Sequence, residues 1–292
     1  MTGMLMDVKR MAVHDGPGLR TTLFLKGCPL SCLWCHNPEG QSMKPQVAFY
    51  AEKCVGCDAC VRVCPQQVAR NMCNREQCTA CGACAAACPT GARKQYGREI
   101  TVDEALKIAL EDRAFYGKNG GVTLSGGEPL MQPEFALEVL HRAKEAGVTT
   151  ALDTCGHAPW SVYERSLAVC DVYLYDLKHM DSAMHKRLTG QGNELILSNL
   201  QKLSQAGARI QVRIPLIPGL NDSAEHIEAA GEFLQSIAPE CVKVLPYHQM
   251  ARMKYEGLGM TDTLPESAED LSARLDRATA QLKAKGLNAY HD

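Results

Sequence analysis

Long apolar runs are missing from this sequence. No uncharged apolar stretch reaches the length of about 18 residues expected of a membrane-spanning helix. The N-terminal segment MTGMLMDVKR has no apolar stretch followed by the small-residue cleavage site of a secretory signal peptide. We therefore expect no membrane span and no secretion, and predict a cytoplasmic protein.

An excess of charge of one sign is also missing. The chain has 31 Lys and Arg residues against 33 Asp and Glu residues, which gives a formal net charge of −2. Bulk nucleic-acid binding requires a basic surface that displaces counterions from phosphates. The balance argues against such binding, although it does not exclude a local basic patch.

Cysteine, in contrast, is abundant, with 15 residues in a chain of 292. Because 46% of the residues are hydrophobic, the chain can form a core without disulfide bonds. Twelve of the cysteines fall between Cys28 and Cys88, and this concentration favours metal binding. The other three lie in or beside expected strands and are predicted to be buried as small apolar side chains: Cys155, Cys170 and Cys241.

Eight cysteines form two copies of one pattern, C-x2-C-x2-C-x3-C-P, at residues 54–65 and 78–89. This pattern is typical of bacterial two-cluster ferredoxins, in which the fourth cysteine of each run ligates the other cluster. We assign one [4Fe–4S] cluster to Cys54, Cys57, Cys60 and Cys88, and a second to Cys64, Cys78, Cys81 and Cys84. Structural zinc is the less favoured alternative, and Cys73 is predicted to be an extra thiol.

Cys28, Cys32 and Cys35 form a different pattern, C-x3-C-x2-C, with no fourth cysteine at cluster spacing. A cubane held by three protein ligands leaves one iron open to a substrate or cofactor, just as a catalytic zinc site keeps an open position. A zinc site or incidental thiols are the alternatives.

Expected strands and helices alternate along most of the remaining chain. Short β-branched or apolar runs occupy residues 21–26, 121–126, 148–153, 171–177, 209–214 and 242–247. Helical patterns occupy residues 101–116, 133–147, 193–207, 224–238 and 267–286. This order predicts an α/β protein with a parallel sheet, either a TIM-like barrel or an open sheet. Residues 45–93 interrupt the order as a small insert.

Six motifs, taken in order, give the chain a specific resemblance. They are D-G-P-G-L-R-T-T-L-F-L-K-G-C at 15–28, W-C-H-N-P-E at 34–39, S-G-G-E-P at 125–129, D-T-C-G at 153–156, Y-D-L-K-H-M at 175–180 and L-P-Y-H-Q at 245–249. With these motifs the chain resembles the radical S-adenosylmethionine (SAM) superfamily. Within it, the chain is similar to the glycyl-radical-enzyme activating enzymes, such as pyruvate formate-lyase activating enzyme, with an added insert.

The resemblance implies a partial (β/α)6 barrel formed by residues 1–44 and 94–292, with residues 45–93 as a ferredoxin-like insert. It also implies three [4Fe–4S] clusters. SAM would chelate the open iron through its amino and carboxylate groups. Gly126 and Gly127 would let backbone approach its methionine part, and Glu128 would receive its ammonium group.

The same resemblance implies roles for residues at other expected strand ends. Asp153, Thr154 and Asp176 would help to hold a monovalent cation near the SAM carboxylate, with Lys178 as a counter-charge. His248 would contact the ribose, and Trp34 and His36 would lie near the adenine. Arg213 either points into the site or forms a structural salt bridge.

The implied activity is reductive cleavage of SAM to a 5′-deoxyadenosyl radical, which removes a Cα hydrogen from a glycine of a partner glycyl radical enzyme. An electron donor such as flavodoxin or ferredoxin would be a second partner. One alternative is a radical SAM enzyme that acts on a small molecule or another protein. A plain electron carrier is a further alternative, but it explains neither the cysteine triplet nor the long βα region.

Overall fold

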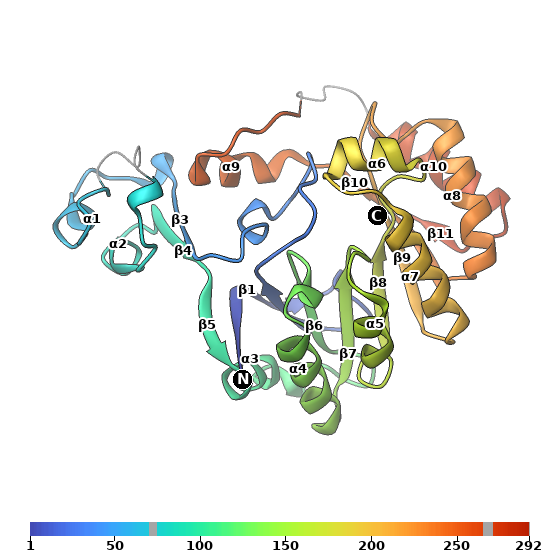
Figure 1. Ribbon diagram of the computed structural model, residues 1–292, viewed down its shortest axis with the longest axis horizontal. Coiled ribbons are helices and arrows are strands. Elements are labelled where there is room, and N and C mark those ends of the chain that lie inside the picture. The colour runs from blue at the N-terminus through green and yellow to red at the C-terminus, as the bar shows by residue number, and fades with distance from the viewer. Residues whose placement is uncertain (70–74, 265–270, 292) are drawn as a thin grey trace.

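The computed structural model describes residues 1–69, 75–264 and 271–291, and its main feature is one open sheet (Figure 1). The nine strands follow the order β11-β10-β9-β8-β7-β6-β2-β1-β5. Neighbours from β2 to β11 are parallel, whereas β1 and β5 add antiparallel strands at one edge. The bounds are β1 Thr2–Ala12, β2 Arg20–Leu25, β5 Arg98–Thr101, β6 Gly121–Gly126, β7 Thr149–Thr154, β8 Val172–Asp176, β9 Ile210–Leu216, β10 Cys241–Pro246 and β11 Ala289–Tyr290.

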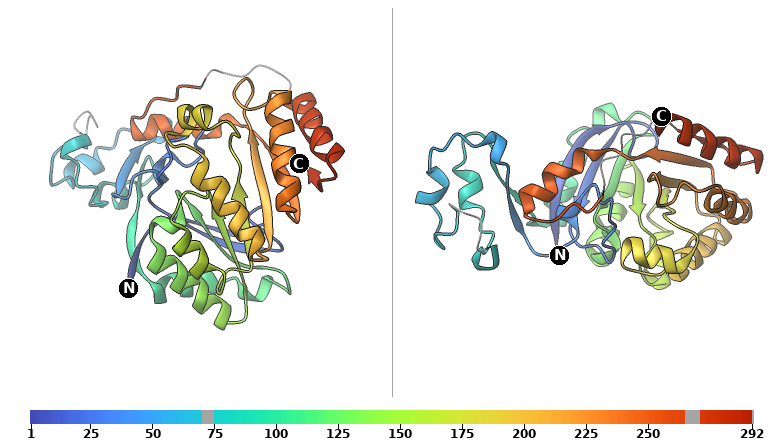
Figure 2. Two further views of the ribbon diagram at one scale, coloured as in Figure 1. Left: turned by 45° about the vertical axis from the view of Figure 1, so that its right-hand side comes forward. Right: turned by 90° about the horizontal axis from the view of Figure 1, so that it is seen from above.

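Helices follow most of the parallel strands, and α3, α4, α5, α7, α8 and α10 lie on the outer side of the sheet, whereas α6 and α9 lie near the cysteine loop (Figure 2). Their bounds are α3 Val102–Leu110, α4 Pro133–Glu145, α5 Trp160–Ser166, α6 Ser182–Thr189, α7 Glu194–Gln205, α8 Ala224–Ile237, α9 Arg252–Leu258 and α10 Leu271–Ala284. At the start of α3, Thr101 and Glu104 form a reciprocal capping box, which satisfies backbone N–H groups that the helix leaves unpaired. Among the described residues, no helix is long and apolar enough to span a membrane.

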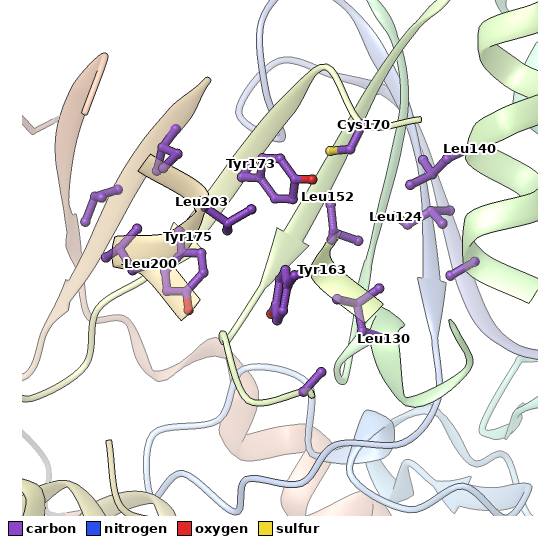
Figure 3. Close-up of a cluster of buried hydrophobic side chains, with 14 of the residues drawn as sticks. Leu124, Leu130, Leu140, Leu152, Tyr163, Cys170, Tyr173, Tyr175, Leu200 and Leu203 are labelled. Atoms are coloured by element: carbon purple, nitrogen blue, oxygen red, sulfur yellow. The ribbon is translucent and has the colours of Figure 1, made fainter. Parts of the chain in front are cut away.

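The hydrophobic core fills the space between the sheet and these helices (Figure 3). Leu124 and Leu152 come from the strands and pack with Leu140 of α4 and Leu203 of α7. Along β9, buried and half-buried residues alternate, as period-two geometry requires. One face of the sheet is therefore covered by helices, while the other face carries a small apolar cluster of Ala151, Val172 and Leu174.

The insert begins and ends in two paired strands. β3 (Gln46–Phe49) and β4 (Arg93–Tyr96) form a separate two-stranded antiparallel sheet. Between them lie the short helices α1 (Ala59–Arg62) and α2 (Ala83–Ala86), to one side of the main sheet (Figure 1). Cys73 lies outside the described residues.

The predicted α/β fold with a parallel sheet is confirmed, and each of the six expected strands overlaps one of β2, β6, β7, β8, β9 and β10. The strands β1, β5 and β11 were not predicted. The α3 helix ends at Leu110, and a 3-10 turn at Arg113–Phe115 follows it in place of the longer helix expected for 101–116.

Arg20, the last residue of the D-G-P-G-L-R motif, ties the start of β2 to its neighbours. The residue is only 1% exposed. It donates hydrogen bonds to Thr123 Oγ1 at 2.7 Å, the Val122 carbonyl at 2.8 Å and Thr149 Oγ1 at 2.9 Å. Burial lowers the pKa of Arg20 to about 10, so the group stays charged at neutral pH. This arginine is a structural element of the fold.

Replacing Arg20 with methionine is expected to lower the free energy of unfolding by about 3 kcal/mol, because several buried acceptors lose their donor. Urea unfolding of the anaerobically purified chain measures the change. Arg10→Met is the matched control, since Arg10 pairs with Glu111 and Asp112 at an exposed position. That control should change stability by less than about 1 kcal/mol, and equal losses in the two variants would contradict a structural role for Arg20.

Candidate functional site

A cavity of about 220 Å³ lies at the carboxyl ends of the parallel strands. In parallel α/β sheets this edge is where ligand and catalytic groups gather. The cavity brings together most of the residues predicted for the site: Cys28, Cys32, Trp34, Cys35, His36, Gly126, Gly127, Asp153, Thr154, Asp176, Lys178 and Arg213. Two predicted residues, Glu128 and His248, are not among its lining residues.

The cysteine triplet lies in the loop that follows β2, and backbone hydrogen bonds hold this loop on two sides. The Cys28 N–H group donates to the Gln41 carbonyl at 3.0 Å. The Ser31 N–H group donates to the Thr189 carbonyl, at the end of α6, at 2.8 Å. The three sulfur atoms are thereby presented to one cavity.

Burial governs the acidity of two of these thiols. It raises the pKa of Cys32 to about 12 and that of Cys35 to about 11. A hydrogen bond with Cys155 is the largest influence on Cys28 and lowers the pKa of that thiol. Since metal ions bind the thiolate form, iron would have to replace the protons of the two buried thiols.

The glycines after β6 bring two backbone segments together. Gly126 has φ +124°, which favours glycine, and a Cβ on Gly127 would clash with the carbonyl oxygens of Gly27 and Gly40. Both glycines line the cavity. They therefore allow the S-G-G-E-P segment to lie directly against the cysteine loop.

Two ion pairs form the wall of the cavity at the ends of β7, β8 and β9. Lys178 Nζ lies 2.7 Å from Asp176, and Arg213 Nη1 lies 3.1 Å from Asp153. Burial alone would lower the pKa of Lys178, but the Asp176 carboxylate outweighs it and the net shift is upward. The sequence left two alternatives for Arg213, a position in the site or a structural salt bridge. The structure shows both, since Arg213 lines the cavity and pairs with Asp153.

Glu128 is held by hydrogen bonds from its surroundings. Its side chain is fully buried, and it accepts hydrogen bonds from Thr154 Oγ1 at 2.8 Å, the Cys155 N–H at 2.7 Å and the Leu130 N–H at 3.1 Å. Burial raises the pKa of this carboxyl group. Glu128 therefore joins the ends of β6 and β7, and its expected contact with the SAM ammonium group stays a prediction.

His248 does not line the cavity, and the residue is exposed. Its ring stacks on that of His36, with centroids 4.1 Å apart and planes 12° apart, while the neighbouring Tyr247 lines the cavity. Burial lowers the pKa of His36 to about 4. The buried Nε2 atom of His36 finds no hydrogen-bond partner among the described residues.

The structure also identifies residues that sequence reasoning did not assign to the site. Cys155 and Tyr247 line the cavity, and Ser125 Oγ donates to Asp153 at 2.7 Å. The position of Cys155 beside two predicted site residues was the available signal. Its predicted burial is confirmed, as is that of Cys170 and Cys241.

The cysteines of the insert line two cavities. One is lined by Cys54, Cys57, Cys60 and Cys88, and the other by Cys64, Cys78, Cys81 and Cys84. In each cavity, three cysteines come from one run and the fourth comes from the other run. Among the described residues, no three His, Cys, Asp or Glu side chains converge on a site for a single metal ion.

The backbone of the insert repeats with the same spacing as its cysteines. Three positions in the first run have positive φ: Gly56 (70°), Asp58 (56°) and Gln67 (56°). The equivalent positions in the second run do too: Ala80 (52°), Gly82 (80°) and Gly91 (67°). Because non-glycine residues seldom adopt this region, the match shows that the two runs fold alike.

Comparison with known proteins agrees with this geometry. Residues 22–234 match the model of the radical SAM superfamily. Trans-4-hydroxy-L-proline dehydratase activating enzyme of Clostridioides difficile is 43% identical over 265 residues, with 88% of each chain covered. Choline trimethylamine-lyase activating enzyme of Oleidesulfovibrio alaskensis is 40% identical over 293 residues, which are 96% of this chain and 94% of the relative.

A solved structure adds a further likeness. The crystal structure of a domain of pyruvate-formate lyase-activating enzyme from Bacteroides vulgatus matches with a TM-score of 0.50 and 34% identity, and the match covers 59% of this chain and 99% of that one. The chain belongs to the radical SAM superfamily and, within it, to the glycyl-radical-enzyme activating enzymes. It is therefore an enzyme of the oxidoreductase type that uses SAM and a [4Fe–4S] cluster to generate a glycyl radical.

Proposed function

We propose that Cys28, Cys32 and Cys35 hold the cluster that binds SAM, and that the cavity beside them is where SAM is cleaved. The observation that carries this proposal is the shared cavity, which places three thiols and two buried ion pairs at one strand edge. The donor set fits the cluster, since three cysteine sulfurs leave one iron for SAM.

The cavity also fits SAM. The wall of the cavity carries two basic side chains, Lys178 and Arg213, each beside a carboxylate. Charges of both signs suit a ligand that has both an ammonium and a carboxylate group. Trp34 and the unpartnered Nε2 atom of His36 offer an apolar surface and a hydrogen-bonding group for the adenine. When bound, SAM and the cluster supply a 5′-deoxyadenosyl radical that takes a hydrogen atom from the Cα of a glycine.

Within this site, Lys178 and Arg213 would supply positive charge for the SAM carboxylate, while Asp176 and Asp153 keep those two cations in place. We also propose a monovalent cation near Asp153, Thr154 and Asp176. This cation would share the two carboxylates with Arg213 and Lys178, which already contact them. His248 would act through His36, on which it stacks.

The protein substrate would be a separate glycyl radical enzyme. Relatives are named for the activation of a hydroxyproline dehydratase and a choline lyase, so similarity alone does not select one partner. We place the reaction in the cytoplasm, because the many thiols of this chain require a reducing compartment.

The test of this function is to incubate the reconstituted chain with SAM, a reductant and a candidate glycyl radical enzyme. The expected result is 5′-deoxyadenosine together with the electron paramagnetic resonance (EPR) doublet of a glycyl radical. A partner in which the radical glycine is replaced by alanine should give no doublet. SAM cleavage without a doublet on any candidate partner would favour action on a small molecule or another protein.

For the insert, we propose two [4Fe–4S] clusters that pass electrons to the cluster of the cysteine triplet. The crossed sets of four cysteines that line its two cavities support this proposal over zinc. The rival role is docking of the partner enzyme by a module that the clusters stabilise, since about 50 residues bury little core alone.

Replacing Cys60 and Cys84 together, one from each set, is expected to distinguish these roles. Under the relay, a strong chemical reductant still supports SAM cleavage, whereas a protein reductant such as flavodoxin does not. The matched control replaces Cys170 and Cys241, which are buried elsewhere. Normal turnover with flavodoxin, combined with lost binding of the glycyl partner, would establish docking instead.

A further inference from the structure

A buried arginine lies at the base of the insert with part of its guanidinium group unpaired. Arg93 begins β4 and is 4% exposed. Its Nη2 atom donates to the Ala69 carbonyl oxygen, and its Cζ atom lies over the Phe49 ring, 4.1 Å from the ring centroid. The buried Nε and Nη1 atoms find no hydrogen-bond partner among the described residues. The proposed function gives this arginine no role.

Arg93 lines the first insert cavity, which is the one lined by Cys54, Cys57, Cys60 and Cys88. Among the described residues of that lining, Asp58 is the one acidic side chain, and it is exposed and not bonded to the two unpaired nitrogens. Burying a cation without a counter-charge costs free energy. A cluster held by four thiolates is negatively charged and would supply that counter-charge to Arg93.

The second insert cavity has a neutral side chain at the matching place. Gln95 lies two residues after Arg93, and side chains two apart in a strand point to the same side. Gln95 Nε2 donates to the Ala80 carbonyl at 2.7 Å, much as Arg93 donates to that of Ala69. A Cβ on Gly82, which lines the second cavity, would clash with the Gln95 amide group. The described residues that line this second cavity include no Lys, Arg, Asp or Glu.

We propose that Arg93 lies against the cluster bound by Cys54, Cys57, Cys60 and Cys88 and raises its reduction potential above that of the other insert cluster. This inference rests on the proposed function of the insert. Reduction adds negative charge to a cluster, and a cation beside it stabilises that charge most strongly where little water screens it. Hydrogen bonds from Nε or Nη1 to the sulfurs would act in the same direction. The cluster beside Arg93 is then the first of the two to accept an electron.

Anaerobic redox titrations monitored by EPR measure the potentials in the native chain, in Arg93→Met, which lacks the charge, and in Arg93→Lys, which keeps it. Lys94→Met is the matched control, because Lys94 is the next residue of β4 but is exposed and pairs with Asp7. The cluster beside Arg93 is identified by the signal that is lost in Cys60→Ala. The cluster of the cysteine triplet is identified by the change of its signal when SAM is added.

In Arg93→Met, the ratio of reduced to oxidised cluster at a fixed potential should fall about tenfold for the cluster beside Arg93, equivalent to about 59 mV for a one-electron couple. The potentials of the other two clusters should change less. Arg93→Lys should keep most of the native potential, and Lys94→Met all of it. An unchanged or higher potential of the cluster beside Arg93 in Arg93→Met overturns the inference.

The native chain provides a second measurement that does not depend on the folding of an Arg93 variant. In the native chain, the cluster beside Arg93 should be reduced at a higher potential than the other insert cluster. Equal potentials, or the reverse order, overturn the inference even if Arg93→Met loses its iron. A reconstituted native chain that holds only the iron of the triplet cluster would overturn the proposed function of the insert as well.

Discussion

Replacing Cys28, Cys32 and Cys35 together with alanine is expected to abolish SAM cleavage and to remove one third of the iron. Three clusters of four irons give about twelve irons per reconstituted chain, and this variant should keep about eight. The reason is that the triplet is the set of cysteines on the main cavity that leaves an iron open for SAM. Iron analysis and measurement of 5′-deoxyadenosine check the two parts separately.

A variant with Cys170 and Cys241 replaced by alanine controls for the loss of buried sulfur, and it should retain all of its iron and activity. Loss of iron with retained SAM cleavage in the triplet variant would contradict the assignment of the SAM-binding cluster. Full iron content in that variant would contradict cluster binding by the triplet itself.

The second large effect is expected from the ion pair of Lys178 and Asp176. Lys178 Nζ lies 2.7 Å from the Asp176 carboxylate. Replacing Lys178 with methionine leaves this carboxylate at the cavity without its cation. Removing one partner of a buried pair destabilises a protein by about 3 kcal/mol. If Lys178 also holds SAM, its loss should reduce SAM cleavage about hundredfold or more, since each factor of ten corresponds to about 1.4 kcal/mol.

A double variant, Asp176→Asn with Lys178→Met, separates stability from binding. It removes the unpaired charge, so the stability should largely return, whereas SAM affinity should not. Equilibrium binding of SAM, iron content and urea unfolding give the three measurements. Arg165→Met is the control, because its pair with Glu134 is exposed and is expected to contribute less than about 1 kcal/mol. Normal SAM affinity in the double variant would leave Lys178 with a structural role only.

The parts of the site that sequence could predict are those fixed by local spacing. The triplet is contained within eight residues, so Cys28 and Cys35 necessarily lie close together. Asp153 and Asp176 end neighbouring strands, and parallel pairing brings the ends of such strands to the same edge. Local pattern and simple topology were sufficient for these residues.

Contacts between distant parts of the chain set the surroundings of other site residues, and sequence reasoning could not predict these contacts. The environment of Glu128 is made by Thr154 and Cys155, which come from another strand. Lys254 of α9 contacts Glu39 at 2.6 Å and the His36 carbonyl at 2.9 Å. The residues in each of these contacts are far apart in the sequence. The periodicity of a single helix or strand therefore does not predict them.

The same limit explains the strands that were not predicted. β1 pairs antiparallel with both β2 and β5, at the edge where the βα alternation does not apply. Its half-buried and exposed residues alternate irregularly, because bulges interrupt its register with β2. A period-two pattern was therefore not visible in its sequence.

The paired strands at the base of the insert have a consequence for how such a protein can change over evolution. Gln46 lies opposite Tyr96, so the chain returns to the place from which it left. A segment with adjoining ends can be gained, lost or exchanged as a unit, while the strands around it keep their neighbours. Tyr50 and Tyr96 also pack with Leu258 of α9 in one small apolar cluster. A replacement module would therefore inherit the same attachment point, next to the helix that contacts the cysteine loop.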